Sequence, residues 1–204
     1  MSEAAATFLT DPGAWADAAF VAPLIAPGLQ AETARRLLAS PRLAPRASRW
    51  LAGLLGHGDP EALPPADRAL ALAPAETLEL VALCAGAVWH APRVRALVLG
   101  ADIAVLRERL GDEVRRFGLR HAALAWTSAR SGAAEDANTL AEDIARDGSA
   151  CLAAWIEALP DWAAARLRLK RPGEGLLPVD DGARMRAVEI VRTVATGMFE
   201  VPAP

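Results

Sequence analysis

The chain has 204 residues, of which 53% are hydrophobic, 23% charged and 5% aromatic, and its formal net charge is −3. This much apolar side chain with nearly balanced charge excludes a disordered chain, and a slightly acidic chain is a poor candidate for general nucleic-acid binding. We therefore expect a globular protein that is long enough to bury a core. Alanine and leucine are abundant while strand-forming residues are scarce, which favours helices throughout.

The first third of the chain predicts helices separated by proline and glycine. Asp11-Pro12 and Ser40-Pro41 each combine a capping side chain with a proline for the first helical turn. Prolines and glycines from Pro23 to Gly28 and from Gly56 to Pro60 end helices. The predicted helices cover residues 14–20, 30–39 and about 41–55.

The middle of the chain predicts the centre of the fold. Residues 75–89 form a helix whose second half is apolar on all sides, and a helix of this kind is buried. Shorter helices are expected over residues 103–110 and 112–124. An Asp112–Arg116 pair four residues apart stabilises the second of them.

The last third predicts three more helices and two breaks. Helical spacing of apolar residues marks residues 140–159, 162–170 and 181–198, with a possible interruption near Gly148. A subdomain border is expected near 128–132 and a flexible loop over 171–180. The prediction is an all-α fold: one compact domain, residues 1–204, of about eight to ten helices around the buried helix 75–89.

Several features favour the cytoplasm. No basic residue precedes Arg35, and the two longest charge-free stretches contain proline and are shorter than the roughly 20 residues that span a bilayer. We therefore expect neither a secretory leader nor membrane insertion. Cys84 and Cys151 are expected to be reduced core residues.

No catalytic or metal-binding motif is present. The three histidines lack a partner at metal-ligand spacing: His57 lies in a loop, His90 ends a helix, where it would complement the helix dipole, and His121 lies on an apolar helical face. No nucleophile elbow or phosphate-binding loop occurs. The acidic doublets, such as Glu142-Asp143, fall at helix starts or on polar faces. We expect no catalytic residue, no cofactor and no metal.

The arginines form three groups along the chain. A helix-turn-helix over residues 31–51 fits the first group, but Pro41 and Pro45 interrupt it, so nucleic-acid binding is not expected. A solvated surface and a protein-binding face both fit the other groups, because arginine is enriched at protein contacts. The third group contains Arg166, Arg168, Lys170 and Arg171. The candidate protein-binding face consists of Arg93, Arg95, Arg115, Arg116 and Arg120.

Several segments resemble the K component of type III secretion systems, the YscK/SctK-like family. The resemblance covers about residues 35–170. It rests on the segments Leu37–Leu43, Leu72–Leu80, Ala91–Arg95, Gly111–Arg120 and Ala165–Lys170.

The resemblance implies a cytosolic adaptor of the sorting platform. Such a protein joins the forkhead-associated-like cytoplasmic domain of the inner-membrane ring protein to the pod subunit. It is mostly helical and has no cofactor. It lies in the cytoplasm, peripheral to the inner-membrane secretion apparatus. The alternative is a small all-α enzyme or ligand-binding regulator with His90 or His121 in a pocket between helices.

Overall fold

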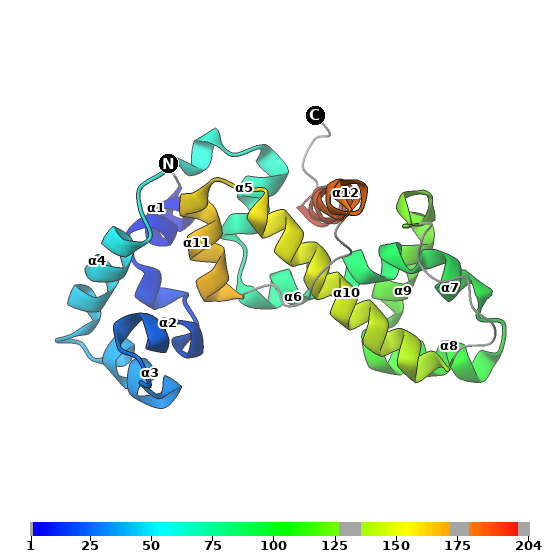
Figure 1. Cartoon of the computed structure of the whole chain (residues 1–204), viewed down its shortest axis with the longest axis horizontal. Coiled ribbons are helices and arrows are strands. Elements are labelled where there is room, and N and C mark those ends of the chain that lie inside the picture. The colour runs from blue at the N-terminus through cyan, green and yellow to red at the C-terminus, as the bar shows by residue number, and fades with distance from the viewer. Residues whose placement is uncertain (1, 127–135, 172–179, 200–204) are drawn as a thin grey trace. The chain divides into compact units, whose positions relative to one another are not determined.

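The computed structural model describes residues 2–126, 136–171 and 180–199 (Figure 1). Within these ranges the chain is all-α, as predicted, and contains twelve α-helices, three short 3-10 helices and no strand. The α-helices are α1 (Glu3–Thr10), α2 (Ala18–Ile25), α3 (Ala31–Ala39), α4 (Ala44–Leu54), α5 (Pro65–Leu72), α6 (Ala75–Trp89), α7 (Ala91–Ala96), α8 (Gly100–Leu110), α9 (Asp112–Arg120), α10 (Ala137–Glu157), α11 (Asp161–Lys170) and α12 (Asp181–Phe199).

The differences from the predicted elements involve proline and glycine. Pro23 was expected to break a helix but lies inside α2, and the helix expected over 14–20 is a 3-10 turn followed by the start of α2. The short helices α1, α5 and α7 were not predicted and raise the count above ten; α5 and α7 each have proline in the first turn. α10 continues through Gly148 without interruption.

The described chain forms two compact units. Unit 1 comprises residues 1–75 and 159–172, and unit 2 comprises residues 76–158 and 173–204. The single domain stays a prediction, and the border expected near 128–132 and most of the loop expected over 171–180 lie outside the described residues. No helix in the described ranges has both the length and the apolarity needed to cross a membrane.

Unit 1 is organised around a buried arginine on α11. The side chain of Arg166 is 1% exposed, and all five of its N–H groups donate to backbone carbonyl oxygens. Two of these oxygens, of Phe8 and Leu9, belong to the last turn of α1, and two, of Leu55 and Gly56, follow the end of α4. The C-terminus of a helix carries unpaired carbonyls and a partial negative charge. The single guanidinium of Arg166 therefore satisfies the C-terminal ends of both α1 and α4.

A second buried cation lies one turn further along α11. Lys170 Nζ donates to Ala71 O at 2.7 Å and to Ala73 O at 2.9 Å, at the end of α5. The ammonium also lies 4.8 Å from the centroid of the Phe8 ring and 5.4 Å from that of Trp15, which is cation–π geometry. The two cations therefore tie α11 to the C-terminal ends of α1, α4 and α5.

Burial gives Lys170 a measurable effect on stability. It lowers the pKa of Lys170 from 10.5 to about 8, so that between these pH values the unfolded chain holds a proton that the folded chain has lost. The free energy of unfolding therefore rises with pH in this interval. The buried thiols act in the opposite direction from about pH 8 upward, because burial raises the pKa of Cys84 from 9.0 to about 12 and also raises that of Cys151, so the unfolded chain ionises these thiols first.

We expect the free energy of unfolding of the parent protein, relative to that of Lys170→Met, to rise by up to about 1 kcal/mol between pH 8 and 9. The two cysteines are common to both proteins, so their contribution cancels in this comparison. Urea unfolding at several pH values measures both proteins. A difference between the two proteins that does not change with pH would contradict the lowered pKa of Lys170.

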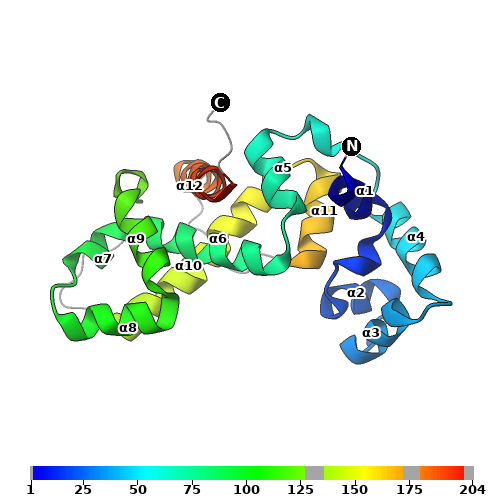
Figure 2. The ribbon, with the colours of Figure 1, turned by 180° about the vertical axis from the view of Figure 1, so that it is seen from behind.

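Unit 2 is held together by close contacts at glycines. A Cβ atom placed on Gly86 of α6 would lie 1.9 Å from Ile144 O of α10, and one on Gly148 of α10 would lie 2.1 Å from Ala82 O of α6. α10 crosses in front of α6 in Figure 1 and behind it in Figure 2. Their backbones therefore touch where neither helix has a side chain.

The other face of α6 meets α9 in the same way, since a Cβ on Gly118 would lie 2.7 Å from Ala87 O. The predicted central helix is thus buried between α9 and α10, with nine buried residues from Leu78 to Trp89. Leu80 is an exception to the predicted all-round burial, because 43% of it is exposed.

Candidate interaction surfaces

The five arginines of the predicted protein-binding face lie on two helices of unit 2. Arg93 and Arg95 are on α7, and Arg115, Arg116 and Arg120 are on α9. α7 packs against α9, so the structure brings the two groups into one region of the unit.

These five arginines are not equally available to a partner. The side chain of Arg93 is only 12% exposed and that of Arg115 is 22% exposed and paired with Asp112. Arg116 is exposed and also pairs with Asp112, at 2.7 Å, as the sequence predicted. Arg95 and Arg120 are exposed, and neither has a carboxylate partner within the described ranges.

Arg93 belongs to a closed ring of five side chains between the end of α6 and α10. Its Nη2 donates to Asp143 Oδ2 at 2.8 Å, and its Nη1 lies 3.0 Å from His90 Nδ1. His90 Nε2 lies 2.8 Å from Asp147 Oδ2. Arg146 closes the ring, because its Nε donates to Asp147 Oδ1 at 2.8 Å and its Nη1 lies 2.6 Å from Asp143 Oδ1.

The contacts of the ring indicate which atoms of His90 donate and accept. An arginine side chain has only donors, so His90 Nδ1 accepts the bond from Arg93. His90 Nε2 then donates to Asp147 Oδ2. The expectation that His90 complements the helix dipole stays a prediction, although both ring nitrogens are engaged in side-chain contacts.

The two carboxylates of the ring stay ionised. Burial raises the pKa of Asp143, but hydrogen bonds from Arg93 and Arg146 and their charges outweigh it, so that the pKa is lowered below 3.8. For Asp147, burial is likewise outweighed by the hydrogen bonds with His90 and Arg146. The stability that these carboxylates add is present above about pH 4 and is lost as the pH falls below it. The ring is a structural clamp between α6, α7 and α10.

His121, the other histidine considered for a pocket, lies at the edge of an apolar groove in unit 2. The groove measures about 800 Å³, and its described lining is mostly α12 together with Ala158. The His121 ring stacks on Phe117 with centroids 4.4 Å apart. Burial and the charge of Arg120 lower the pKa of His121.

The groove does not assemble a recognisable catalytic arrangement. No carboxylate hydrogen-bonds to His121 in the parts of the chain that the structure describes. Glu189 in the groove wall is paired with Arg186 at 2.9 Å. Over the described residues, no three His, Cys, Asp or Glu side chains lie close enough to hold a metal ion. His57, the third histidine, is exposed in its loop.

Two residues of the third basic group, which begins at Arg166, do not lie on the surface as expected. Arg166 and Lys170 were considered for a solvated or protein-binding face, but both are buried and bind backbone carbonyls within unit 1. Only Arg168 between them is exposed. The reason is the helical period, since residues 166 and 170 share the face of α11 that packs inward.

Comparison with known families agrees with the resemblance seen in the sequence. A family model described as YOP proteins translocation protein K (YscK) matches residues 59–194. The chain belongs to the YscK family. It is therefore a type III secretion-related protein, and the family is one of secretion accessory components and not of enzymes.

Curated relatives include the nodulation protein NolU of Rhizobium fredii and that of Sinorhizobium fredii (strain NBRC 101917 / NGR234). Each is 35% identical over 127 residues, which is 60% of this chain and 57% of the relative. The match thus spans little more than half of those relatives. No solved structure matches the chain.

Some of the candidate residues lie inside the range matched by the YscK family model, and other parts of the chain lie outside it. The candidate arginines of α7 and α9, the ring around His90 and the glycine contacts of α6 lie within residues 59–194. Helices α1 to α4 precede the YscK match. A function shared by the YscK family is therefore to be sought first in unit 2 and in α5 and α11.

Proposed function

We propose that this YscK-family chain is a cytosolic adaptor of a type III secretion sorting platform. In this proposal it binds the forkhead-associated-like cytoplasmic domain of the inner-membrane ring protein through one surface and the pod subunit through another, without catalysis. The observation that carries the proposal is the family match over residues 59–194. The relatives named NolU support the same family assignment.

The internal packing of each unit supports a passive, rigid role. In unit 1, Arg166 and Lys170 use their donors on helix ends, and in unit 2 the ring around His90 uses its polar groups on one another. Such groups hold helices in fixed positions and are not free to act on a substrate. An adaptor needs surfaces of fixed geometry, which these contacts supply.

The exposed arginines of α7 and α9 form the proposed basic surface. Arg95, Arg116 and Arg120 present their charges to solvent, whereas Arg93 and Arg115 are committed to contacts inside unit 2. Guanidinium groups pair well with carboxylates, so an acidic patch on the ring domain is the expected partner. Such charge complementarity sets orientation and association rate more than affinity.

Reversing the charges of Arg95, Arg116 and Arg120 to glutamate is expected to weaken binding to one of the two partners by about tenfold or more, mainly through the association rate. The thermal unfolding of the variant should change little, because Arg95 and Arg120 have no carboxylate partner among the described residues and the exposed pairs of Arg116 with Asp112 and Glu113 are worth only a few tenths of a kcal/mol. Arg93→Glu is the contrasting variant, and it should destabilise unit 2 by breaking the ring. Unchanged binding of the triple variant to both partners would remove this surface from the proposal.

Calorimetry with the purified ring domain and the purified pod subunit from the same organism tests the adaptor function. The expected result is a complex of defined stoichiometry with at least one of them. Absence of binding to both would contradict the proposed function. The contacts are expected to be modest in area.

A further inference from the structure

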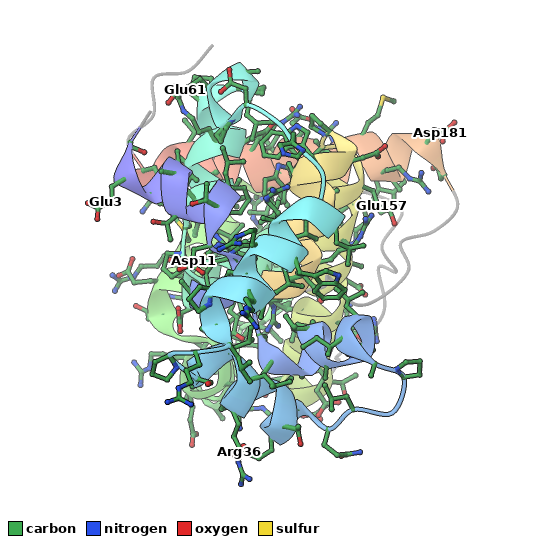
Figure 3. All side chains as sticks on the ribbon, turned by 90° about the vertical axis from the view of Figure 1, so that its left-hand side faces the viewer. Glu3, Asp11, Arg36, Glu61, Glu157 and Asp181 are labelled. Carbon is green, nitrogen blue, oxygen red and sulfur yellow. The ribbon has the colours of Figure 1, made fainter. Side chains whose placement is uncertain are left out.

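The outer face of α4 carries an apolar stripe that no part of the described chain covers. Leu43, Trp50 and Leu54 are 43%, 46% and 54% exposed, and they are three of the few large hydrophobic side chains that unit 1 exposes. Together with the half-buried Ala47, they follow the spacing i, i+4, i+7 and i+11, which places them along one side of the helix. α4 faces the viewer in Figure 3.

The stripe lies beside the core face of the same helix, about 100° round its axis. Ser48, Leu51 and Leu55 are buried on that core face, where Leu51 and Leu55 join a hydrophobic cluster with Val21 and Leu169. α4 is thus apolar on two sides, and only one of them is used within unit 1. A single exposed leucine is ordinary, but a helical row of exposed apolar residues is typical of an interaction site.

A row of arginines runs beside the stripe. Arg42, Arg46 and Arg49 are exposed, and none of them has a carboxylate partner within the described ranges. The segment from Thr33 to Gly58 contains no aspartate or glutamate. At 100° per residue the three arginines lie on the side of the stripe that is turned away from the core.

The arginines of α3, the helix before α4, have an acidic partner on their own helix. On α3, Arg35 and Arg36 both pair with Glu32, which lies one turn before them. Glu32 offsets part of their charge, whereas no acidic residue within α4 offsets the charge of its arginines. The helix that exposes the apolar stripe therefore also carries arginines without an acidic neighbour on the same helix.

We propose that this surface, Leu43, Ala47, Trp50 and Leu54 with the flanking Arg42, Arg46 and Arg49, is the docking site for an amphipathic helix of a partner protein that carries carboxylates along one flank. An apolar row with this spacing matches the seam of a second helix, as in coiled-coil pairs. Tryptophan and arginine are the residue types that contribute most to protein interfaces. The arginine row fixes the orientation of the acidic flank.

Other occupants fit the surface less well. A second copy of this chain would place six arginines between two α4 helices with no carboxylate from either. Pro45 lies in the first turn of α4 and does not interrupt the helix, contrary to expectation. Duplex DNA would fit the arginines, but Trp50 and Leu54 would then face the phosphates. An anionic membrane would contact only three large apolar side chains, a small area for stable anchoring.

This inference deepens the adaptor proposal and rests on it for the identity of the partner, but its chemistry is testable without that identity. The probe is a synthetic amphipathic helix with leucine along one seam and glutamate on one flank. A matched peptide carries lysine in place of each glutamate. Binding of both peptides to the full chain is measured by fluorescence anisotropy.

The expected result is that the glutamate peptide binds and the lysine peptide does not. Trp50→Ala should weaken binding by about tenfold or more, and reversal of Arg42, Arg46 and Arg49 to glutamate should transfer binding from the glutamate peptide to the lysine peptide. The control variant reverses three other exposed arginines, Arg107, Arg168 and Arg184, and should bind as the parent does. Circular dichroism confirms that each variant is folded.

Failure of the glutamate peptide to bind, equal binding to both peptides, or an equal loss in the control variant would overturn the docking site. Binding of the parent chain only to phosphatidylglycerol vesicles or only to duplex DNA, with loss on reversal of the three arginines, would replace the partner helix by that other occupant. Failure of the adaptor proposal gives a different result: the chain would bind the glutamate peptide but neither the ring domain nor the pod subunit.

Discussion

Replacing Arg166 by alanine is expected to lower the free energy of unfolding by about 3–5 kcal/mol, enough to unfold unit 1 at ordinary temperatures. The substitution leaves five carbonyl oxygens from α1, α11 and the end of α4 without their donor, and each buried unpaired acceptor is costly. It also opens a cavity between Phe8 and Trp162, whose rings flank the guanidinium. Urea unfolding monitored by tryptophan fluorescence measures the effect.

Two further variants distinguish the effect of the five donors of Arg166 from the effect of its positive charge. Arg166→Lys keeps the charge but supplies three donors on a single atom, so it cannot reach two helix ends and should be nearly as unstable. Arg168→Ala removes an exposed charge from the same helix and should change stability by less than about 0.5 kcal/mol. A stable Arg166→Ala protein, or an equal effect of Arg168→Ala, would show that the helix ends do not depend on this side chain.

Gly86→Ala is expected to destabilise unit 2 by more than about 3 kcal/mol, although alanine is the better helix former. The new methyl group would lie 1.9 Å from Ile144 O, and a backbone atom in the middle of α10 cannot move aside without displacing the helix. Thermal unfolding followed by circular dichroism measures the change. Gly148→Ala, on the other side of the same contact, is expected to have a similar effect.

Gly53→Ala is the matched control, because Gly53 also lies within a helix but has open space where its Cβ would be. Removing this glycine is expected to stabilise the protein by about 0.5–1 kcal/mol. The opposite signs at residues 53 and 86 would show that contact between helices, and not glycine itself, determines the result. Stabilisation at both positions would contradict the close approach of α6 and α10.

Much of the fold was predictable because its longer helices carry local signals. The bounds of α6 were predicted to the residue, and α11 and α12 to within one residue, from apolar spacing, capping residues and proline. α1, α5 and α7 were missed because six to eight residues give too short a pattern, and tertiary packing decides their conformation. The division into two units was not predictable, because it depends on α11 returning to the N-terminal helices.

The candidate surfaces were less predictable, because a charged residue does not reveal its partner. Arg166 and Lys170 resemble the exposed Arg168 in sequence, and only the structure shows the helix ends that they bind. Asp143 and Asp147, one turn apart on α10, gave a local signal for a shared contact, but their partners Arg93 and His90 lie about 50 residues earlier. The stripe on α4 was not predicted, because the helical spacing of Leu43, Trp50 and Leu54 does not reveal which side of the helix packs inward.

A bridging measurement tests the adaptor function most directly. The ring protein's cytoplasmic domain is immobilised on a biosensor surface, and the pod subunit is passed over it with and without this chain. The proposed function predicts that the pod subunit is retained only when the chain is present, in proportion to the chain already bound. Equal retention of the pod subunit without the chain, or displacement of the chain by the pod subunit, would contradict a bridging role.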